Sequence, residues 1–106
     1  TEFALKHDPG GIIDVEFIVQ YLVLGYSHKH PSLTGNLGNI ALLRMAGELG
    51  LIDPQQAAAA GNAYREYRRL QHAKRLSANP KAPIPREEIE KHITAVDALW
   101  KAVFAD

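Results

Sequence analysis

The chain opens with a turn that carries two glycines and leads directly into a long apolar segment. This opening stretch reads Lys6-His7-Asp8-Pro9-Gly10-Gly11-Ile12-Ile13-Asp14-Val15-Glu16-Phe17. Pro9 pushes Asp8 out of the helical region and fixes its own backbone, so the chain has to turn at this point. We therefore expect residues 1–7 to be extended or irregular, residues 1–11 to form a linker and turn, and helical structure to follow over residues 12–106.

The first helix is predicted between Ile12 and His28, where nearly every residue is apolar. Its only polar stripe has the spacing of a single helix face and consists of Glu16, Gln20 and Ser27. Because this polar stripe is narrow, the helix is predicted to be largely buried. The segment His28-Lys29-His30-Pro31 then supplies cations near the C-terminal dipole and a proline that stops the helix.

Two further helices are predicted between turn-forming residues. After a turn at residues 32–36, apolar residues at helical spacing predict a second helix that ends at Gly50. Asp53-Pro54 is a strong helix start, so a third helix is predicted from Pro54 to about Ser77. Its predicted buried stripe consists of Ala60, Ala63, Tyr64, Tyr67 and Leu70. The other side of this helix is heavily basic.

A fourth helix is expected after a proline-rich connection at residues 77–85. Pro85 is predicted to be its first residue, and the segment from Arg86 to Phe104 carries an apolar seam at alternating four- and three-residue steps. The seam consists of Ile89, Ile93, Val96, Trp100 and Val103. The sequence contains no alternation typical of a strand. The predicted fold class is therefore all-α, and the predicted architecture is an up-and-down four-helix bundle over residues 12–106.

Composition limits the classes of function that the chain can have. Its 106 residues with 46% hydrophobic content are enough for one core, and its 12 basic and 12 acidic side chains cancel. With no overall field, neither nucleic acid nor a membrane is expected as a partner. Cysteine is absent, which excludes thiolate metal sites. We expect a soluble, cytoplasmic protein and, because the first residue is Thr1, a fragment of a longer one.

Two carboxylates at the start of the first helix are candidate functional groups. Asp14 and Glu16 are two positions apart, which places them about 160° from each other on a helix, so they cannot hold one metal ion together. Glu16 shares the polar stripe and is expected to face solvent or the rim of a site. Asp14 projects toward the apolar side, where it either accepts hydrogen bonds from N–H groups of the first turn or pairs with a cation on a neighbouring helix.

The candidate cations for that pair lie on the third helix. Arg68 and Arg75 fall at the edge of the predicted buried stripe, with His72 further round the helix. Arginine at such a boundary suits bidentate contact with a carboxylate or a phosphate. An ion pair between Asp14 and Arg68 would tie the first helix to the third. The alternative is a basic face that is simply solvated.

The paired glycines and the histidines admit two other interpretations. Gly10-Gly11 before a helix could form an anion cradle, but no P-loop lysine follows and three acids lie nearby, so a tight turn is favoured. His28 and His30 lie too close to a helix end to form a closed metal site without further ligands. We therefore predict no metal site in this chain.

The opening stretch closely resembles a motif of a known enzyme family. The residues that match are Lys6, Asp8-Pro9-Gly10-Gly11-Ile12 and Asp14-Val15-Glu16-Phe17-Ile18-Val19-Gln20-Tyr21, and the match continues through Leu22-Val23-Leu24, Leu33-Thr34, Asn39, Ala63-Tyr64, Arg68 and His72. This pattern is similar to the helical domain in the C-terminal, transferase half of the bifunctional glutamine synthetase adenylyltransferase/adenylyl-removing enzymes. The related uridylyltransferase of the PII signalling protein carries a shorter version of the motif and is the alternative family.

The resemblance implies a function for the parent enzyme rather than for the fragment. Such an enzyme transfers AMP from ATP, with Mg²⁺, to a tyrosine of glutamine synthetase, under control of PII and glutamine. The family's catalytic glycine-serine turn and Asp-x-Asp pair do not occur here, so the fragment is expected to be inactive and to bind no cofactor by itself. Residues 1–11 would then link the bundle to a preceding nucleotidyltransferase domain.

The resemblance also implies which residues lie at the junction with that catalytic domain. They are Lys6, Asp8, Gly10, Gly11, Asp14 and Glu16. The alternative function is a regulatory or docking module that binds PII or glutamine synthetase through the basic face of the third helix. A third possibility is a free-standing helical adaptor.

Overall fold

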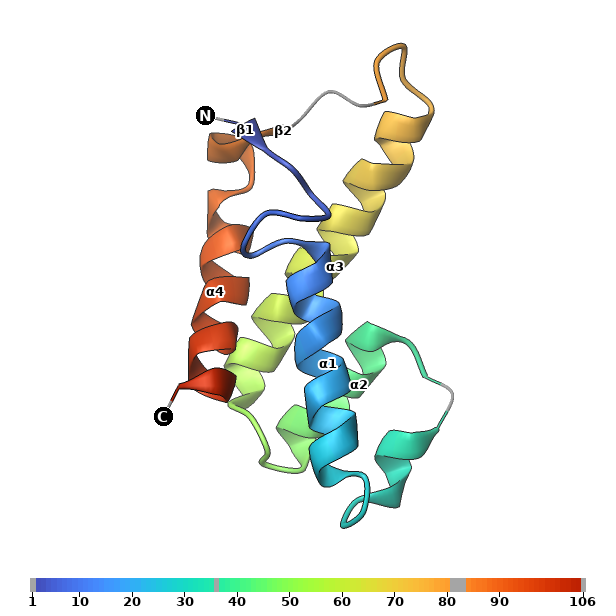
Figure 1. The fold of residues 1–106 in the computed structure, drawn as a ribbon, viewed down its shortest axis with the longest axis vertical. Coiled ribbons are helices and arrows are strands. Elements are labelled where there is room, and N and C mark those ends of the chain that lie inside the picture. The colour runs from blue at the N-terminus through green and yellow to red at the C-terminus, as the bar shows by residue number, and fades with distance from the viewer. Residues whose placement is uncertain (1, 36, 81–83, 106) are drawn as a thin grey trace.

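The computed structural model describes residues 2–35, 37–80 and 84–105 and is mainly helical (Figure 1). Its helices are α1 (Ile12–Tyr26), α2 (Asn39–Glu48), α3 (Pro54–Arg75) and α4 (Glu90–Phe104), with two short 3-10 helices at Pro31–Thr34 and Arg86–Glu88. Two strands of two residues each, β1 (Glu2–Phe3) and β2 (Ile84–Pro85), complete the fold. Parts of the predicted linker, of the turn at 32–36 and of the connection at 77–85 lie outside the described residues. No described helix has the length and apolar character needed to cross a membrane.

The third predicted helix is confirmed, and it forms the centre of the molecule. Asp53 caps α3 by accepting a hydrogen bond from the Gln56 N–H at 3.0 Å, and Pro54 occupies the first turn. The predicted stripe faces the core, where its alanines and tyrosines are buried and Leu70 is half-buried. Small residues bring α2 and α3 close together. A Cβ atom added at Gly47 would lie 3.1 Å from the Ala57 Cβ, which is tighter than most such contacts.

The first helix is confirmed in position, but the prediction that it is largely buried is wrong. One side packs into the core, while Phe17 is 54% exposed and Leu24 is 80% exposed on the other. The reason is that α1 lies on one face of the molecule, in front of α3 and between α4 and α2 in Figure 1, and contacts all three with its inner side. Aromatic residues of α1 and α4 gather on the outer side, where the Phe17 ring centroid lies 5.6 Å from that of Trp100 and 5.7 Å from that of Phe104.

The helices do not alternate in direction as an up-and-down bundle requires. Asn39 begins α2 and Glu16 lies near the start of α1, yet both reach the same side chain, Tyr64 of α3. The two helices therefore begin at the same level and run in the same direction, and α3 runs opposite to them (Figure 1). Among the described residues, the 3-10 helix at Pro31–Thr34 lies between α1 and α2 in the chain. A helical fold is confirmed, but strict alternation is not.

The small sheet and the start of α4 also depart from the sequence-based expectation. The strands pair antiparallel, with Glu2 opposite Pro85 and Phe3 opposite Ile84, so the fold is not strictly all-α. Pro85 belongs to β2 instead of opening the fourth helix, and α4 begins only at Glu90, after the 3-10 helix. Two residues are too few to show alternation, and their partners are far apart in the sequence. Such a pairing leaves no local pattern to detect.

Candidate functional site

The glycines of the opening stretch form a tight turn that no other residue fits. Gly10 has a φ of +88°, a left-handed conformation, and an added Cβ would lie 3.0 Å from the Ile93 Cγ2 atom. A Cβ at Gly11 would overlap the carbonyl oxygen of Leu5. Both glycines are buried. The prediction of a tight turn is confirmed, and each glycine has its own steric reason.

The N–H groups of this turn bind the chain itself. The Gly10 N–H donates to Asp14 Oδ2 at 2.7 Å, and the Ile12 N–H donates to the Leu5 carbonyl at 2.7 Å. The next N–H groups are used in the same way, since Gly11 donates to the Asp8 carbonyl at 2.9 Å and Ile13 to the Lys6 carbonyl at 3.1 Å. An anion cradle needs N–H groups that are free to point at a ligand. The anion-cradle interpretation is therefore not supported.

Tyr67 fixes the turn to the central helix. Its hydroxyl donates a hydrogen bond of 2.8 Å to the Gly10 carbonyl, and its side chain is fully buried. Burial raises the pKa of Tyr67 well above its ordinary value, and the Asp97 carboxylate raises it further. The hydroxyl therefore stays protonated and keeps donating. Phe3 of β1 packs on the same ring, with 6.0 Å between centroids, so the small sheet supports this contact.

Glu16 is the carboxylate that connects α1 to α3. The Tyr64 hydroxyl donates to Glu16 Oε2 at 3.1 Å and accepts a hydrogen bond from Asn39 Nδ2 at 3.0 Å. Burial is the main reason that the pKa of Tyr64 is raised, and the charge of Glu16 adds to it. Glu16 lines a surface groove, in keeping with the expected place at the rim of a site, but it does not simply face solvent. It is half-buried and joins three helices through one hydroxyl.

The sequence left two roles open for Asp14, and its role in the structure is the local one. Its carboxylate accepts the Gly10 N–H across the turn, and its side chain is half-buried. The predicted ion pair with Arg68 is not formed, because the one salt bridge among the described residues joins Arg69 to Glu66 at 2.6 Å. Glu16 therefore spans the helices, a role that was not predicted for it, and Asp14 closes the turn.

The opening carboxylates do not fit a magnesium site. Asp8 Oδ2 accepts the Ala4 N–H at 2.9 Å, while Asp14 and Glu16 bind Gly10 and Tyr64. Each carboxylate is thus directed to a different protein group. Within the part of the chain that the structure describes, no three side chains of the metal-binding types come together. A Mg²⁺ ion needs several oxygen ligands around one point, and this turn does not supply them.

The remaining predicted residues lie on the surface. Lys6, Arg68, His72 and Arg75 are all exposed. Lys6 and Arg75 line the same groove beside the opening segment, whereas Arg68 lies near enough to Tyr64 for its charge to lower the pKa of that hydroxyl. The site thus divides into buried glycines, half-buried carboxylates and an exposed cationic surface.

Sequence reasoning missed the polar roles of the two tyrosines and Asn39. The sequence predicts Tyr64 and Tyr67 as members of a buried stripe, which is confirmed, but not as hydrogen-bond donors to Glu16 of α1 and to the Gly10 carbonyl of the turn. The sequence did indicate that these tyrosines have polar partners. A buried tyrosine hydroxyl requires a hydrogen-bond partner, and the rest of the stripe consists of alanine and leucine. The identity of the partner could not be read from the sequence.

Comparison with known proteins finds a matching family model and several similar proteins. Residues 1–82 match the family model described as GlnD PII-uridylyltransferase. A protein of Aromatoleum aromaticum is 57% identical over 102 residues, which cover 96% of this chain and 11% of the relative. A protein of Nitrosomonas europaea is 53% identical over 116 residues, which cover 96% of this chain and 12% of the relative. A protein of Bordetella bronchiseptica is 51% identical over 104 residues, which cover 98% of this chain and 11% of the relative.

All three relatives are named bifunctional glutamine synthetase adenylyltransferase/adenylyl-removing enzyme. The chain therefore spans between 11% and 12% of the length of these curated relatives.

Proposed function

The chain belongs to the GlnD PII-uridylyltransferase family and, within it, to the bifunctional glutamine synthetase adenylyltransferase/adenylyl-removing enzymes, and from this premise we propose that it is the helical domain beside the transferase site. The family resemblance of the opening stretch is thereby confirmed. The parent enzyme would transfer AMP from ATP, with Mg²⁺, to a tyrosine of glutamine synthetase in the cytoplasm. We place this domain in the C-terminal half of the enzyme.

In this proposal the chain supplies support and not catalytic groups. The three opening carboxylates are used in hydrogen bonds within the domain, and the turn offers no free N–H cradle. ATP and the metal ion would be held by a neighbouring nucleotidyltransferase domain. The isolated chain is therefore expected to be inactive.

One observation carries the proposal, and it is the rigidity of the opening turn. Tyr67 holds the turn from α3, Asp14 closes it, and both glycines are packed against backbone or side-chain atoms. Lys6 lies on this support with its side chain exposed. A charge held on a rigid turn suits the junction of two domains, because little side-chain and loop freedom remains to be lost on contact.

The candidate rim residues then take different roles. Gly10 and Gly11 shape the turn, Asp14 closes it, and Glu16 sets the position of α1 through Tyr64. Asp8 holds the segment before the turn by accepting the Ala4 N–H. Lys6 is the residue that contacts the neighbouring domain or its substrate.

The test replaces Lys6 in the full-length enzyme. Lys6→Ala should lower the rate of glutamine synthetase adenylylation about tenfold and leave the melting temperature unchanged, because the side chain makes no contact that holds the fold. Lys29→Ala, at an exposed lysine beyond the far end of α1, is the matched control and should change neither quantity. Equal rates in the two variants would contradict the proposed contact.

A second function is favoured by the surface of α3. Its exposed cations include Arg65, Arg68 and Arg75, and only Arg69 forms a salt bridge among the described residues. Such a face suits docking of PII or of glutamine synthetase. Pull-down with the immobilised chain tests it, since retention of either protein supports docking and retention of neither opposes it.

A further inference from the structure

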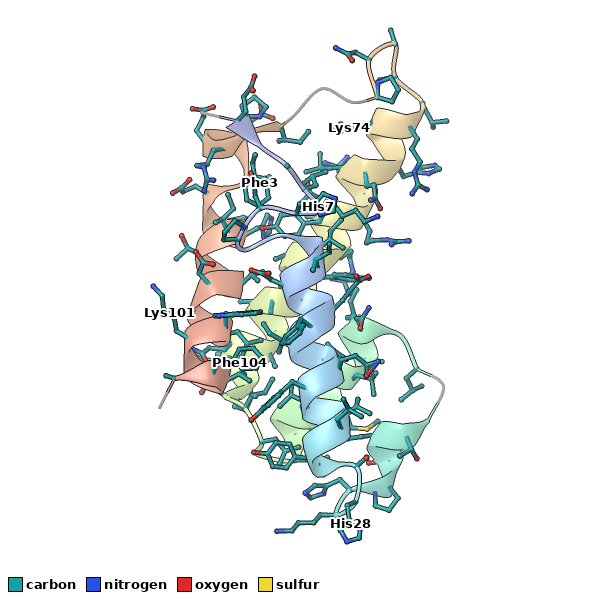
Figure 2. All side chains as sticks on the ribbon, viewed as in Figure 1. Phe3, His7, His28, Lys74, Lys101 and Phe104 are labelled. Atoms are coloured by element: carbon teal, nitrogen blue, oxygen red, sulfur yellow. The ribbon has the colours of Figure 1, made fainter. Side chains whose placement is uncertain are left out.

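A groove runs between the opening segment and the C-terminal part of α3. It encloses about 790 Å³ and is formed by residues that are far apart in the sequence. Figure 2 shows the two sides, with His7 on the opening segment and Lys74 near the end of α3. This volume falls in the range of sites that hold an organic ligand or a peptide segment and far exceeds the space of a single small ion.

The charged side chains that the described part of the chain contributes to the groove are all cationic. They are Lys6 on the opening segment and Lys74 and Arg75 on α3, and His7 adds a fourth basic group. No carboxylate of the residues that the structure describes lines it, although the chain as a whole carries equal numbers of acidic and basic residues. Among the described residues, none of these cations forms a salt bridge. The groove therefore concentrates positive charge that the protein does not neutralise itself.

The rest of the lining distinguishes between kinds of anion. Leu5 and Pro80 give the groove an apolar floor, and Gln71 adds an amide that can both donate and accept. Its described lining residues include no Phe, Tyr or Trp ring on which a nucleotide base could stack. The turn N–H groups that could cradle a phosphate are already bonded, and the adjacent end of α3 carries the negative pole of the helix. These features disfavour a nucleotide or a compact phosphate group.

We propose that this groove binds an acidic peptide segment of a partner protein. Carboxylates spaced along the segment would pair with Lys6 on one side and with Lys74 and Arg75 on the other. The peptide backbone would lie over the apolar floor and hydrogen-bond to Gln71. This inference rests on the docking function proposed above and names the surface and the chemistry of the bound segment. Because Lys6 also stands at the proposed domain junction, the test substitutes Lys74 and Arg75 only.

The proposal is tested with a fluorescent peptide of alternating glutamate and alanine. Its binding to the full chain is measured by fluorescence anisotropy at low salt. Lys74→Ala combined with Arg75→Ala should weaken binding about tenfold, since each exposed charge pair contributes up to about 1 kcal/mol. The control combines Lys29→Ala with Arg44→Ala, two exposed cations outside the groove, and should bind as the unchanged chain does. Melting temperatures confirm that each variant is folded.

A reversal of charge at the two α3 cations of the groove is the second test of the proposal. Lys74→Glu with Arg75→Glu should lose the acidic peptide and gain a peptide of alternating lysine and alanine. Equal binding by the unchanged chain and the Lys74/Arg75 variants would overturn the proposal, and so would tripolyphosphate that competes at far lower concentration than the peptide. If these variants still retain PII or glutamine synthetase in the pull-down, docking stands but does not use this groove.

Discussion

Two tyrosines of α3, one helical turn apart, hold the opening turn and α1 by contacts that differ in kind. Tyr67 donates to the Gly10 carbonyl inside the core, whereas Tyr64 donates to the Glu16 carboxylate near the surface. The first contact holds backbone to side chain in a region that water does not reach. The second is a network of side chains that also includes Asn39.

The difference shows that α3 can hold the opening turn in one position and still allow small adjustments of α1. The contact of Tyr67 is surrounded by tightly packed groups, including the Phe3 ring and the turn glycines, so a change there has no room to relax. The network of Tyr64 is half-open, because Glu16 and Asn39 are each only half-buried. We expect the turn to respond to substitution with loss of stability, and the network to respond with smaller, coupled effects.

The largest effect is expected at the turn itself. Gly11→Ala places a Cβ against the Leu5 carbonyl and should lower the free energy of unfolding by about 3 kcal/mol. Gly25→Ala is the matched control, because it lies in α1 with no atom within 4 Å of the added Cβ. It should raise the free energy of unfolding by about 0.5–1 kcal/mol through helix propensity. Urea denaturation measures both, and equal losses would mean that the turn is not rigid.

The next effect concerns the buried hydroxyl. Tyr67→Phe leaves the Gly10 carbonyl without its partner and should cost about 1–3 kcal/mol of unfolding free energy. Tyr26→Phe, which removes an exposed hydroxyl with no hydrogen bond within the described residues, should cost almost nothing. Thermal unfolding of the two variants sharpens the comparison. A Tyr67→Phe variant as stable as the unchanged chain would show that the carbonyl is satisfied by another group.

A smaller and coupled effect is expected in the open network. Glu16→Ala and Tyr64→Phe remove the two partners of one hydrogen bond, so a double-mutant cycle should give a coupling of about 0.5–1.5 kcal/mol. Asp14→Ala and Arg68→Ala form the control cycle and should be additive within about 0.5 kcal/mol, because the two residues do not pair. Coupling in the second cycle as strong as in the first would mean that Asp14 and Arg68 do form the ion pair predicted from the sequence.

The smallest effect is expected from pH. Burial lowers the pKa of His92, whose ring lies 6.1 Å from that of Tyr67, and the charge of Lys91 lowers it further while Glu66 opposes the change. The unfolded chain then binds the proton more readily, so stability is full above about pH 6.5 and decreases as the pH falls below it. Melting temperatures between about pH 7.5 and 5.5 should show this decrease, and His92→Gln should reduce it. An unchanged slope in the variant would assign the decrease to other groups.

Features that depend on neighbouring residues were predictable from the sequence, and features that depend on distant ones were not. The Asp53 cap, the start of α3 at Pro54 and the glycine turn were all predicted, because each follows from local backbone chemistry. The pairing of Phe3 with Ile84 was missed because it joins residues far apart in the chain.

The helix-spanning role of Glu16 was missed for a similar reason. Helical geometry correctly separated Glu16 from Asp14, but it could not decide which of them faces α3. That choice depends on how α1 is rotated about its axis, and a helix that is apolar on nearly every side gives no indication of it. The same ambiguity explains why the exposure of Phe17 was not foreseen.

The aromatic cluster on the outer side of α1 and α4 gives the chain an optical reporter. Trp100 is the only tryptophan, and its ring centroid lies 4.5 Å from that of Phe104 and 5.6 Å from that of Phe17. Because Trp100 is half-buried at the contact of two helices, its fluorescence should change in colour and intensity when α1 moves relative to α4. Movement of the first helix can therefore be followed by intrinsic emission, without attaching a label.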